Sequence, residues 1–385
     1  MVSNLSGISR VLKIDLSGNN AAFLWGPRKT GKTTLLKQLF PEAKYYDLLD
    51  TELKTRLLVR PALLREQVLA QNPRLVVLDE IQKVPSLLDE VHWCLENTKT
   101  KFVLCGSSAR KLRRAGANLL GGRAWRFEMF PLTTAEVPDA DLDRILNHGL
   151  LPKHYLEEHP ERSLSGYVFD YLEEEILEEA LTRRVPNFAK FLEAVAASHG
   201  QLINYSNVAR DCGVSCKTAR EYFQVLEDTL LGHALEPWRK RRKRRLIETA
   251  KFYLFDVGLV RALNEMRPIL RGTEEHGRAF EHFLIEEIRA YLSYSEKRIP
   301  IFFWRTSTGL EVDLVAGDLD LAVEFKAVPM ADERHAKGLR ALHEERKVRK
   351  RLVISLDDEP RRLADGTDIL PWRAFCRGLW SGEWI

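Results

Sequence analysis

A glycine-bounded loop at Gly26–Thr33, with the letters GPRKTGKT, constrains the fold of this chain more than any other feature. A short apolar run at 21–25 precedes the loop, and Leu35, Leu36 and Leu39 follow it at the spacing of one helix face. A strand, a glycine turn and a helix in this order allow backbone N–H groups and the helix dipole to converge on a phosphate. We therefore predict a phosphate-binding loop in a parallel α/β sheet.

The residue types in this loop indicate which atoms meet a nucleotide. Lys32 should reach the β- and γ-phosphates, and the hydroxyl of Thr33 should ligate Mg²⁺. ATP and Mg²⁺ are therefore the predicted cofactors. The residues expected to contact them are Gly26, Pro27, Arg28, Lys29, Thr30, Gly31, Lys32, Thr33 and Thr34, together with Asp79.

A second strand is expected within RLVVLDEIQ at 74–82. The apolar run Leu75–Leu78 indicates a strand that is buried on both faces, as parallel sheets require. Asp79 and Glu80 stand at its carboxyl end, where open α/β sheets place their ligands. We predict that Asp79 holds the Mg²⁺ shell and that Glu80 polarises the attacking water.

A third strand, within KFVLCGSSAR at 101–110, ends in polar residues. Ser107 or Ser108 fits a sensor of the γ-phosphate on the neighbouring strand, and we expect Ser107 to contribute to catalysis. Serine is also a preferred helix N-cap, so a structural role is the alternative.

Arg123 stands in a glycine turn, LLGGRAW, just before another apolar strand. An arginine at this position can reach the γ-phosphate of a neighbouring subunit and stabilise the charge of the transition state. That role requires a homo-oligomer. A structural salt bridge is the alternative.

Four segments, GPRKTGKTTLL, VVLDEIQKVP, LCGSSARKL and GGRAWRFEMFPLTTAE, together resemble a bacterial and archaeal family of AAA+-like ATPases. Members of that family join the ATPase domain to a carboxy-terminal domain of unknown function, and the similarity runs over nearly the whole chain. The resemblance implies an ASCE-type sheet in which the phosphate-loop strand and the Asp-Glu strand are central and adjacent. We expect the AAA+-like ATPase core over 1–135 and a helical lid or connector over 136–185.

Residues 204–231 indicate two helices joined by a turn at Asp211–Val214, with Ser215 capping the second helix. The second helix has one apolar face. Lys217 and Arg220 therefore remain outside, near the helix start, where a recognition helix meets the major groove of DNA.

Two strands are expected on either side of Arg239–Arg245, which are seven consecutive basic residues. Such a block repels itself and usually lies on a solvated surface, where it meets polyanions. Together with the two helices it predicts a winged helix-turn-helix over 186–270. We expect this region to bind DNA through Lys217, Arg220 and the basic block, because neutralising phosphates releases counterions. A domain that pairs with its own ATPase module and merely has a basic loop is the alternative.

The last region, 271–385, begins with a helix over 277–292 and continues with three short strands. Glu324 and Lys326 share one face of their strand, and Asp313 ends the strand before it. Two carboxylates that converge beside a lysine hold Mg²⁺ and activate water for attack on a phosphodiester. The lysine stabilises the negative charge that develops.

This Asp…Glu-x-Lys arrangement resembles the PD-(D/E)xK nucleases, although Val312 stands where the name of that superfamily has proline. The resemblance implies a nuclease-like α/β domain in which Asp313, Glu324 and Lys326 are catalytic. Glu281 fits the acidic residue on the first helix and is expected to bind the metal ion with Asp313 and Glu324. Many such cores bind DNA without cutting it, so a binding module is the alternative.

Composition limits the remaining choices. The five cysteines are few and odd in number, which argues against a disulfide framework. No apolar run approaches the roughly 20 residues that a membrane span needs, so we expect a cytoplasmic protein without a membrane partner. The regions together predict an ATP-hydrolysing protein that processes or remodels DNA, with branched DNA as one candidate. A nucleotide-dependent regulatory switch, or a branch-remodelling ATPase with a silent nuclease core, are the alternatives.

Overall fold

The computed structural model describes residues 7–17, 20–110, 112, 120–168, 185–238, 249–265 and 267–385. The chain divides into two compact units. The first comprises the residues up to Pro131 together with Val225–Leu231, and the second comprises Leu132–Gln224 with Gly232–Ile385. The basic block Arg239–Arg245, on which much of the predicted DNA contact depends, lies outside the described residues.

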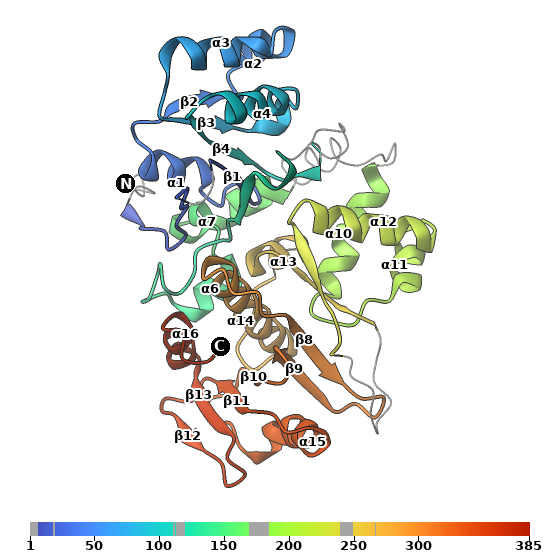
Figure 1. Cartoon of the computed structure of the whole chain (residues 1–385). Coiled ribbons are helices and arrows are strands. Elements are labelled where there is room, and N and C mark those ends of the chain that lie inside the picture. The colour runs from blue at the N-terminus through green and yellow to red at the C-terminus, as the bar shows by residue number, and fades with distance from the viewer. Residues whose placement is uncertain are drawn as a thin grey trace. The chain divides into compact units, whose positions relative to one another are not determined.

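A five-stranded parallel sheet forms the centre of the first unit, in the order β2-β3-β4-β1-β5 (Figure 1). Its buried side chains make one continuous apolar core with those of the helices. In chain order the elements are β1 (Ala21–Trp25), α1 (Lys32–Leu39), β2 (Lys44–Asp47), α2 (Thr51–Val59), α3 (Ala62–Gln71), β3 (Leu75–Asp79), η2 (Ile81–Lys83), α4 (Leu87–Asn97), β4 (Lys101–Gly106), η3 (Leu120–Gly122) and β5 (Ala124–Glu128).

The order of these strands corrects one prediction. The phosphate-loop strand β1 and the Asp-Glu strand β3 are central but not adjacent, because β4 lies between them and pairs with both. The chain leaves β3, runs through α4 and returns into this gap. All three strands are parallel, so their carboxyl ends still meet at one edge of the sheet. Ser107, which directly follows β4, is thereby placed between the phosphate loop and Asp79.

The apolar face predicted for α1 is shorter than the sequence suggested. Leu35 and Leu36 are buried, whereas Leu39 in the last turn is exposed. The first turn of this helix, where the phosphate loop ends, is therefore held against the core more firmly than the last.

The second unit contains the remaining helices and two sheets. In chain order its elements are α6 (Leu142–His148), α7 (Pro152–Leu156), α8 (Pro160–Gly166), α10 (Val185–Ala197), α11 (Tyr205–Cys212), α12 (Cys216–Asp228, ending in the first unit), β6 (Gly232–Leu235), β7 (Lys251–Leu254), α13 (Val257–Leu263), α14 (Glu274–Tyr294), β8 (Ile301–Arg305), β9 (Glu311–Ala316), β10 (Leu321–Lys326), η5 (Glu333–Ala336), α15 (Lys337–Glu345), β11 (Lys350–Ser355), β12 (Arg361–Arg362), β13 (Asp368–Pro371) and α16 (Trp372–Trp380).

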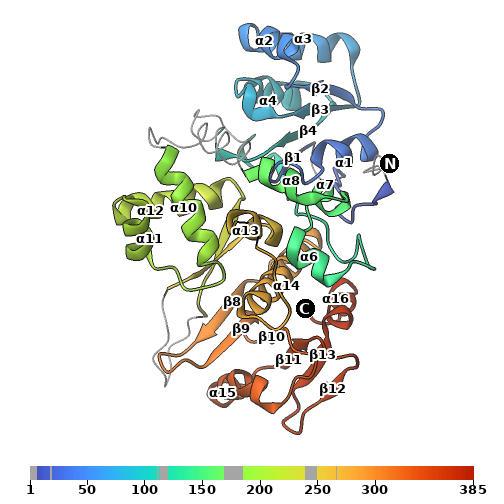
Figure 2. The ribbon, with the colours of Figure 1, turned by 180° about the vertical axis from the view of Figure 1, so that it is seen from behind.

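The larger sheet of this unit is mixed, in the order β12-β13-β11-β10-β9-β8 (Figure 2). Strands β8, β9 and β10 form an antiparallel meander, and β11 and β13 continue from β10 in parallel. The long helix α14 packs against β10 and carries the apolar face predicted for residues 277–292. Although α14 has 21 residues, no helix in the described ranges is both long and apolar enough to cross a bilayer.

Helices α11 and α12 are joined by a tight turn, as predicted. Gly213 ends α11 with a positive φ of 65°, and the backbone N–H of Thr218 donates to the Ser215 hydroxyl at the start of α12. Strands β6 and β7 then pair antiparallel on either side of the basic block. Lys217 and Arg220 are exposed, and the Arg220 guanidinium lies over the ring of Tyr205 at 4.7 Å from its centroid.

Candidate functional site

The loop between β1 and α1 has the geometry of a phosphate cradle. Gly31 adopts a φ of 94°, which favours glycine, and a Cβ on Gly26 would lie 2.6 Å from the carbonyl oxygen of Met129. The ammonium of Lys32 is buried and donates to the carbonyl oxygens of Gly26 and Pro27 at 2.7 and 2.9 Å. The lysine therefore folds over its own loop, where phosphate oxygens can replace the two carbonyls.

Other contacts hold the loop from within and from behind. The hydroxyl of Thr30 donates to the carbonyl of Pro27 at 2.8 Å. Arg10, which the sequence did not single out, donates to the carbonyls of Thr30, Phe130 and Pro131 at 2.7, 2.8 and 3.0 Å. Among the other predicted nucleotide contacts, the surface positions are Arg28, which is half-buried, and Lys29 and Thr34, which are exposed.

Thr33 and Asp79, both predicted magnesium ligands, are brought together from α1 and β3. The Thr33 hydroxyl donates to Asp79 Oδ2 at 2.7 Å, and the hydroxyl of Tyr45 donates to the same oxygen at 2.6 Å. Burial and the Asp79 carboxylate raise the pKa of Tyr45, so the phenol keeps its proton. A hydroxyl and a carboxylate are hard oxygen donors that suit Mg²⁺. Tyr45 was missed because it lies on a different strand with no motif around it.

Glu80 directly follows β3 in a left-handed conformation, with a φ of 58°. The amide of Gln82 donates to the Glu80 carboxylate and, at 3.3 Å, to the hydroxyl of Ser107. Gly106 makes this possible, because a Cβ there would lie 2.3 Å from the Gln82 side-chain oxygen. Gln82 therefore links the predicted water-polarising residue to the predicted sensor.

The two serines after β4 have different partners. Ser107 and Ser108 are both buried, but only Ser107 is contacted by Gln82. The Ser108 hydroxyl accepts from the backbone N–H of Arg110 at 3.4 Å, which is the weak capping contact of the alternative interpretation. The contact with Gln82 distinguishes Ser107 from Ser108, and the sensor role of Ser107 stays a prediction.

Arg123 lies at the surface of the first unit. Its Nε is 2.8 Å from Glu96 Oε1, and about half of each side chain is exposed. This is the salt bridge that the sequence left as the alternative. Exposed pairs of this kind contribute little stability, so the contact does not prevent Arg123 from turning to another partner.

The second unit contains a buried cluster of charged side chains on β9 and β10. Asp313 lies inside β9 rather than at its end, where it was predicted, and its Oδ2 accepts from the backbone N–H of Phe325 at 2.8 Å. The ammonium of Lys326 is 2.7 Å from Glu324 Oε1 and 3.7 Å from Asp313 Oδ2. The antiparallel pairing of β9 and β10 thus brings all three predicted residues together.

Burial changes the ionisation of this cluster. Burial, followed by the charge of Asp313, raises the pKa of Glu324 to about 8. Two effects act on the pKa of Lys326. Burial alone lowers this pKa, but the neighbouring Asp313 and Glu324 outweigh burial and raise it above its usual value. Burial and the charge of Asp313 therefore favour a proton on Glu324 near neutral pH, and a cation bound beside it would displace that proton.

Glu281, on α14, joins the cluster but has its own partners. Its carboxylate accepts from the ammonium of Lys251 at 2.9 Å and from the hydroxyl of Tyr253 at 2.6 Å. Lys251 also lies 2.6 Å from Glu311, which begins β9. Lys251 escaped the sequence analysis, although a lysine in the otherwise apolar strand KFYLF was a visible signal.

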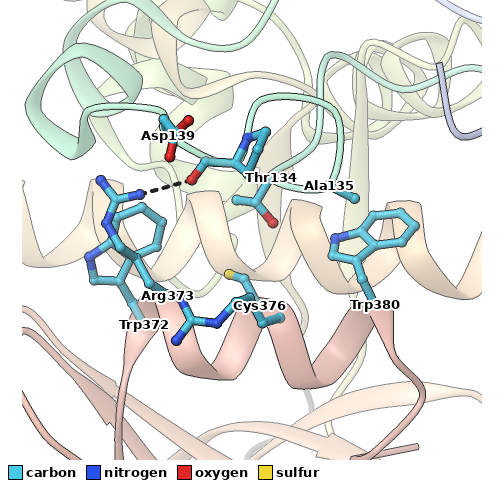
Figure 3. Close-up of a pocket in the computed structure, with 9 residues that line it drawn as sticks. Thr134, Ala135, Asp139, Trp372, Arg373, Cys376 and Trp380 are labelled. Atoms are coloured by element: carbon cyan, nitrogen blue, oxygen red, sulfur yellow. Dashed lines mark hydrogen bonds between the residues drawn. The ribbon is translucent and has the colours of Figure 1, made fainter. Parts of the chain in front are cut away.

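A separate pocket of about 370 Å³ lies between α16 and the segment 134–139 of the second unit (Figure 3). Trp372, Cys376 and Trp380 line it from one face of α16. Arg373 closes one end and donates to the carbonyls of Pro138 and Ala140 at 3.1 and 2.6 Å. None of the catalytic, nucleotide-binding or metal-binding residues predicted from sequence lines this pocket.

Three family models match successive segments of the chain. Residues 18–138 match a family model described as an AAA domain, and residues 276–375 match a model described as a domain of unknown function (DUF4143). A third model, also described as a domain of unknown function (DUF8612), matches residues 139–269. The chain therefore combines a segment that matches an AAA domain with segments that match domains of unknown function.

Among curated proteins, uncharacterized proteins of Mycobacterium tuberculosis and Mycobacterium bovis are each 28% identical over 300 residues. The match covers 76% of this chain but only 66% of each mycobacterial protein. An uncharacterized protein of Haemophilus influenzae is 26% identical over 204 residues, covering 48% of this chain and 51% of that protein.

Two solved structures show a distant likeness. A Walker-type ATPase of Pyrococcus abyssi has a TM-score of 0.45 and 15% identity, covering 65% of this chain and 92% of that chain. The ORC1 protein of Aeropyrum pernix, solved in complex with DNA, has a TM-score of 0.28 and 13% identity, covering 64% of this chain and 86% of that chain.

Proposed function

We propose that this chain binds ATP with Mg²⁺ at the edge of the five-stranded sheet, hydrolyses it, and uses the energy to process or remodel DNA. One observation carries the ATPase part of the proposal: the Thr33 hydroxyl and the Asp79 carboxylate meet at 2.7 Å beside the loop over which Lys32 is folded. Thr33 lies on α1 and Asp79 ends β3. Nucleotide sites built on a phosphate loop use both groups to hold Mg²⁺.

Each residue has a distinct task in this proposal. Lys32 leaves the carbonyls of its loop and neutralises phosphate charge, while backbone N–H groups of the loop bind phosphate oxygens. Thr33 and Asp79 would hold Mg²⁺, which neutralises charge on the phosphates when bound. Glu80, oriented by Gln82, polarises the attacking water. Ser107 accepts from the same amide nitrogen of Gln82 that contacts Glu80, so it can respond to the γ-phosphate.

The DNA part of the proposal depends on cationic residues. Lys217 and Arg220 are exposed near the start of α12, and the basic block Arg239–Arg245 connects β6 to β7 in the sequence. We assign them to phosphate contact in a winged-helix arrangement. Replacing the basic residues of the block with serine should weaken binding to every DNA sequence alike and make its salt dependence shallower. Unchanged affinity and an unchanged salt slope would remove the block from the proposal.

ATP turnover measured with and without DNA tests the whole proposal. We expect single-stranded, duplex or four-way DNA to stimulate hydrolysis by the full chain. Slow hydrolysis that no DNA form changes would instead favour a nucleotide-dependent regulatory switch.

A second activity, metal-dependent cleavage of DNA, is favoured by the cluster of Asp313, Glu324 and Lys326. Glu324 Oε2 is buried and has no hydrogen-bond partner among the described residues, which fits an atom that awaits a cation. Asp313 and Glu324 would hold the ion, which activates water when bound. Asp313→Ala or Lys326→Ala should then abolish Mg²⁺- or Mn²⁺-dependent cleavage while ATP hydrolysis persists. A parent protein that cuts no DNA form with either metal would leave a binding module.

A further inference from the structure

Lys251 is a buried cation that the roles assigned above leave unused. It begins β7, is only 3% exposed, and its ammonium lies 2.9 Å from Glu281 and 2.6 Å from Glu311. Burial alone would lower the pKa of Lys251, but Glu281 and the other acids around it raise it well above its usual value. The ammonium is therefore a permanent charge inside the carboxylate cluster.

The cluster divides into two halves with different partners. In one half, Glu281 is satisfied by Lys251 and Tyr253, and Glu311 is satisfied by Lys251 and by Arg305 at 3.1 Å. In the other half, Asp313 and Glu324 share Lys326.

The second half is the less complete of the two. Lys326 is 32% exposed at its side chain, whereas that of Lys251 is 4% exposed, so Lys326 has more freedom to move away from its acids. Glu324 Oε2 is buried without a hydrogen-bond partner among the described residues. The half made by Asp313 and Glu324 is therefore where a metal ion can enter.

We infer that Lys251 is a fixed cation of this site, held in the place that a second metal ion would otherwise take. A single divalent ion then binds between Asp313 and Glu324. Glu281 holds Lys251 instead of ligating metal, which differs from its predicted role. The inference rests on the metal site proposed above and specifies how many ions that site takes.

The two carboxylates of Asp313 and Glu324 are enough to hold one divalent ion. Mg²⁺ is commonly held by one or two carboxylates, with water and substrate phosphate completing its shell. Within the part of the chain that the structure describes, no group of three or more His, Cys, Asp or Glu side chains is arranged to hold a metal. Lys251 interacts electrostatically with Asp313 as well as with Glu281, so its charge is directed to the side of the cluster where the ion binds. Lys251 is thus a positioning residue that fixes the charge of the site.

The test counts ions instead of measuring cleavage. Mn²⁺ is titrated calorimetrically into the nucleotide-free full chain carrying Asp79→Asn, which removes the metal ligand of the ATP site. This protein should bind a single Mn²⁺, and Glu324→Gln should abolish that binding. Lys251→Met frees Glu281 and Glu311, so the variant should bind a second Mn²⁺. Lys251→Arg, which keeps the charge, should bind a single ion again, and so should Lys251→Met combined with Glu281→Gln.

Thermal unfolding provides a second readout that is independent of stoichiometry. Without metal, Lys251→Met leaves two partly buried acids without their main cation, so it should unfold at a lower temperature than the parent. Mn²⁺ should raise the unfolding temperature of Lys251→Met more than that of the parent. Lys347→Met, at an exposed lysine, is the matched control and should behave like the parent. If Lys251→Met is recovered folded only with Mn²⁺ present, that dependence supports the inference.

The outcomes separate this inference from the function on which it rests. If the parent binds no Mn²⁺, or if Glu324→Gln binds as much Mn²⁺ as the parent, both the metal site and the role of Lys251 are overturned. A parent that binds two ions, or a Lys251→Met variant that binds a single ion with parental affinity, overturns the role of Lys251 and leaves the metal site standing.

Discussion

The guanidinium of Arg110 pairs with the carboxylate of Asp228, and both side chains are largely buried within the first unit. Arg110 lies three residues beyond Ser107 in the segment that follows β4. Asp228 is the last residue of α12, whose other end carries the exposed Lys217. Within the first unit, the ion pair therefore holds the last residue of α12 beside the proposed sensor segment.

Breaking this ion pair should uncouple DNA binding from ATP hydrolysis. Asp228→Asn removes the charge and keeps the shape of the side chain. We expect ATP turnover without DNA to stay at the parental rate, while stimulation by DNA falls by about fivefold, which is at the lower end of typical coupling between two sites. Turnover across a DNA titration measures both quantities. Asp211→Asn, at an exposed aspartate beside the turn after α11, is the control, and equal stimulation in both variants would contradict the coupling.

Lys32 and Glu80 should fail in different ways. Lys32→Ala removes the charge that meets the phosphates in every state, so nucleotide binding should be lost. Glu80→Gln keeps the contact with Gln82 but cannot polarise water, so it should bind ATP normally and turn it over about 10²–10⁴-fold more slowly. Calorimetric binding and steady-state hydrolysis distinguish the two. Parental turnover by Glu80→Gln would show that another group activates the water.

A matched pair of variants distinguishes a catalytic role of Arg123 from its salt bridge with Glu96. If Arg123 acts on a neighbouring subunit, Arg123→Ala should bind ATP normally and hydrolyse it about 10³-fold more slowly. Glu96→Gln breaks the same ion pair but keeps the guanidinium, so its turnover should be parental.

Subunit mixing then tests action between chains. Mixing Arg123→Ala with Glu80→Gln should restore part of the activity, because each subunit supplies what the other lacks. Equal loss in Arg123→Ala and Glu96→Gln, or a strictly monomeric protein without complementation, would leave only the salt bridge.

Most of the candidate ATP site could be predicted from sequence because its parts are local. The alternation of β1, the glycine loop and α1 is written in consecutive residues, and so is the apolar run that ends in Asp79. The order of strands could not be predicted in the same way. Pairing of β4 with both β1 and β3 depends on contacts between distant segments, and the family resemblance placed β1 and β3 side by side where β4 in fact lies.

The carboxylate cluster also shows which residues sequence patterns can and cannot bring together. Asp313, Glu324 and Lys326 lie on consecutive strands, so alternation alone was enough to bring them together. Lys251 reaches the cluster from a hairpin 30 residues before Glu281, and no local pattern relates the two. Tyr45 and Arg10 reach the nucleotide site in the same manner. Residues that complete a site from a distant element are the ones that sequence patterns miss.

Glu287, on α14, should make the stability of the protein fall as the pH rises towards 7. Its Oε1 accepts from the hydroxyl and backbone N–H of Thr134 and from the indole N–H of Trp380. Burial nevertheless raises the pKa of Glu287 to about 7, from the value of 4.5 that an unperturbed glutamate has. Between these values the folded state binds more protons than the unfolded state, so the contribution of Glu287 is complete below pH 4.5 and is lost through pH 7.

Glu287→Gln keeps an acceptor oxygen for Thr134 and Trp380 but has no proton to lose. We therefore expect the unfolding temperature of this variant to change less than that of the parent between about pH 5 and pH 8, followed by circular dichroism. Burial lowers the pKa of His199 to about 4, which acts in the opposite sense but equally in both proteins, so the comparison cancels it. Glu383→Gln, at an exposed glutamate, should keep the parental pH dependence. A Glu287→Gln curve parallel to that of the parent would mean that Glu287 stays ionised throughout this range.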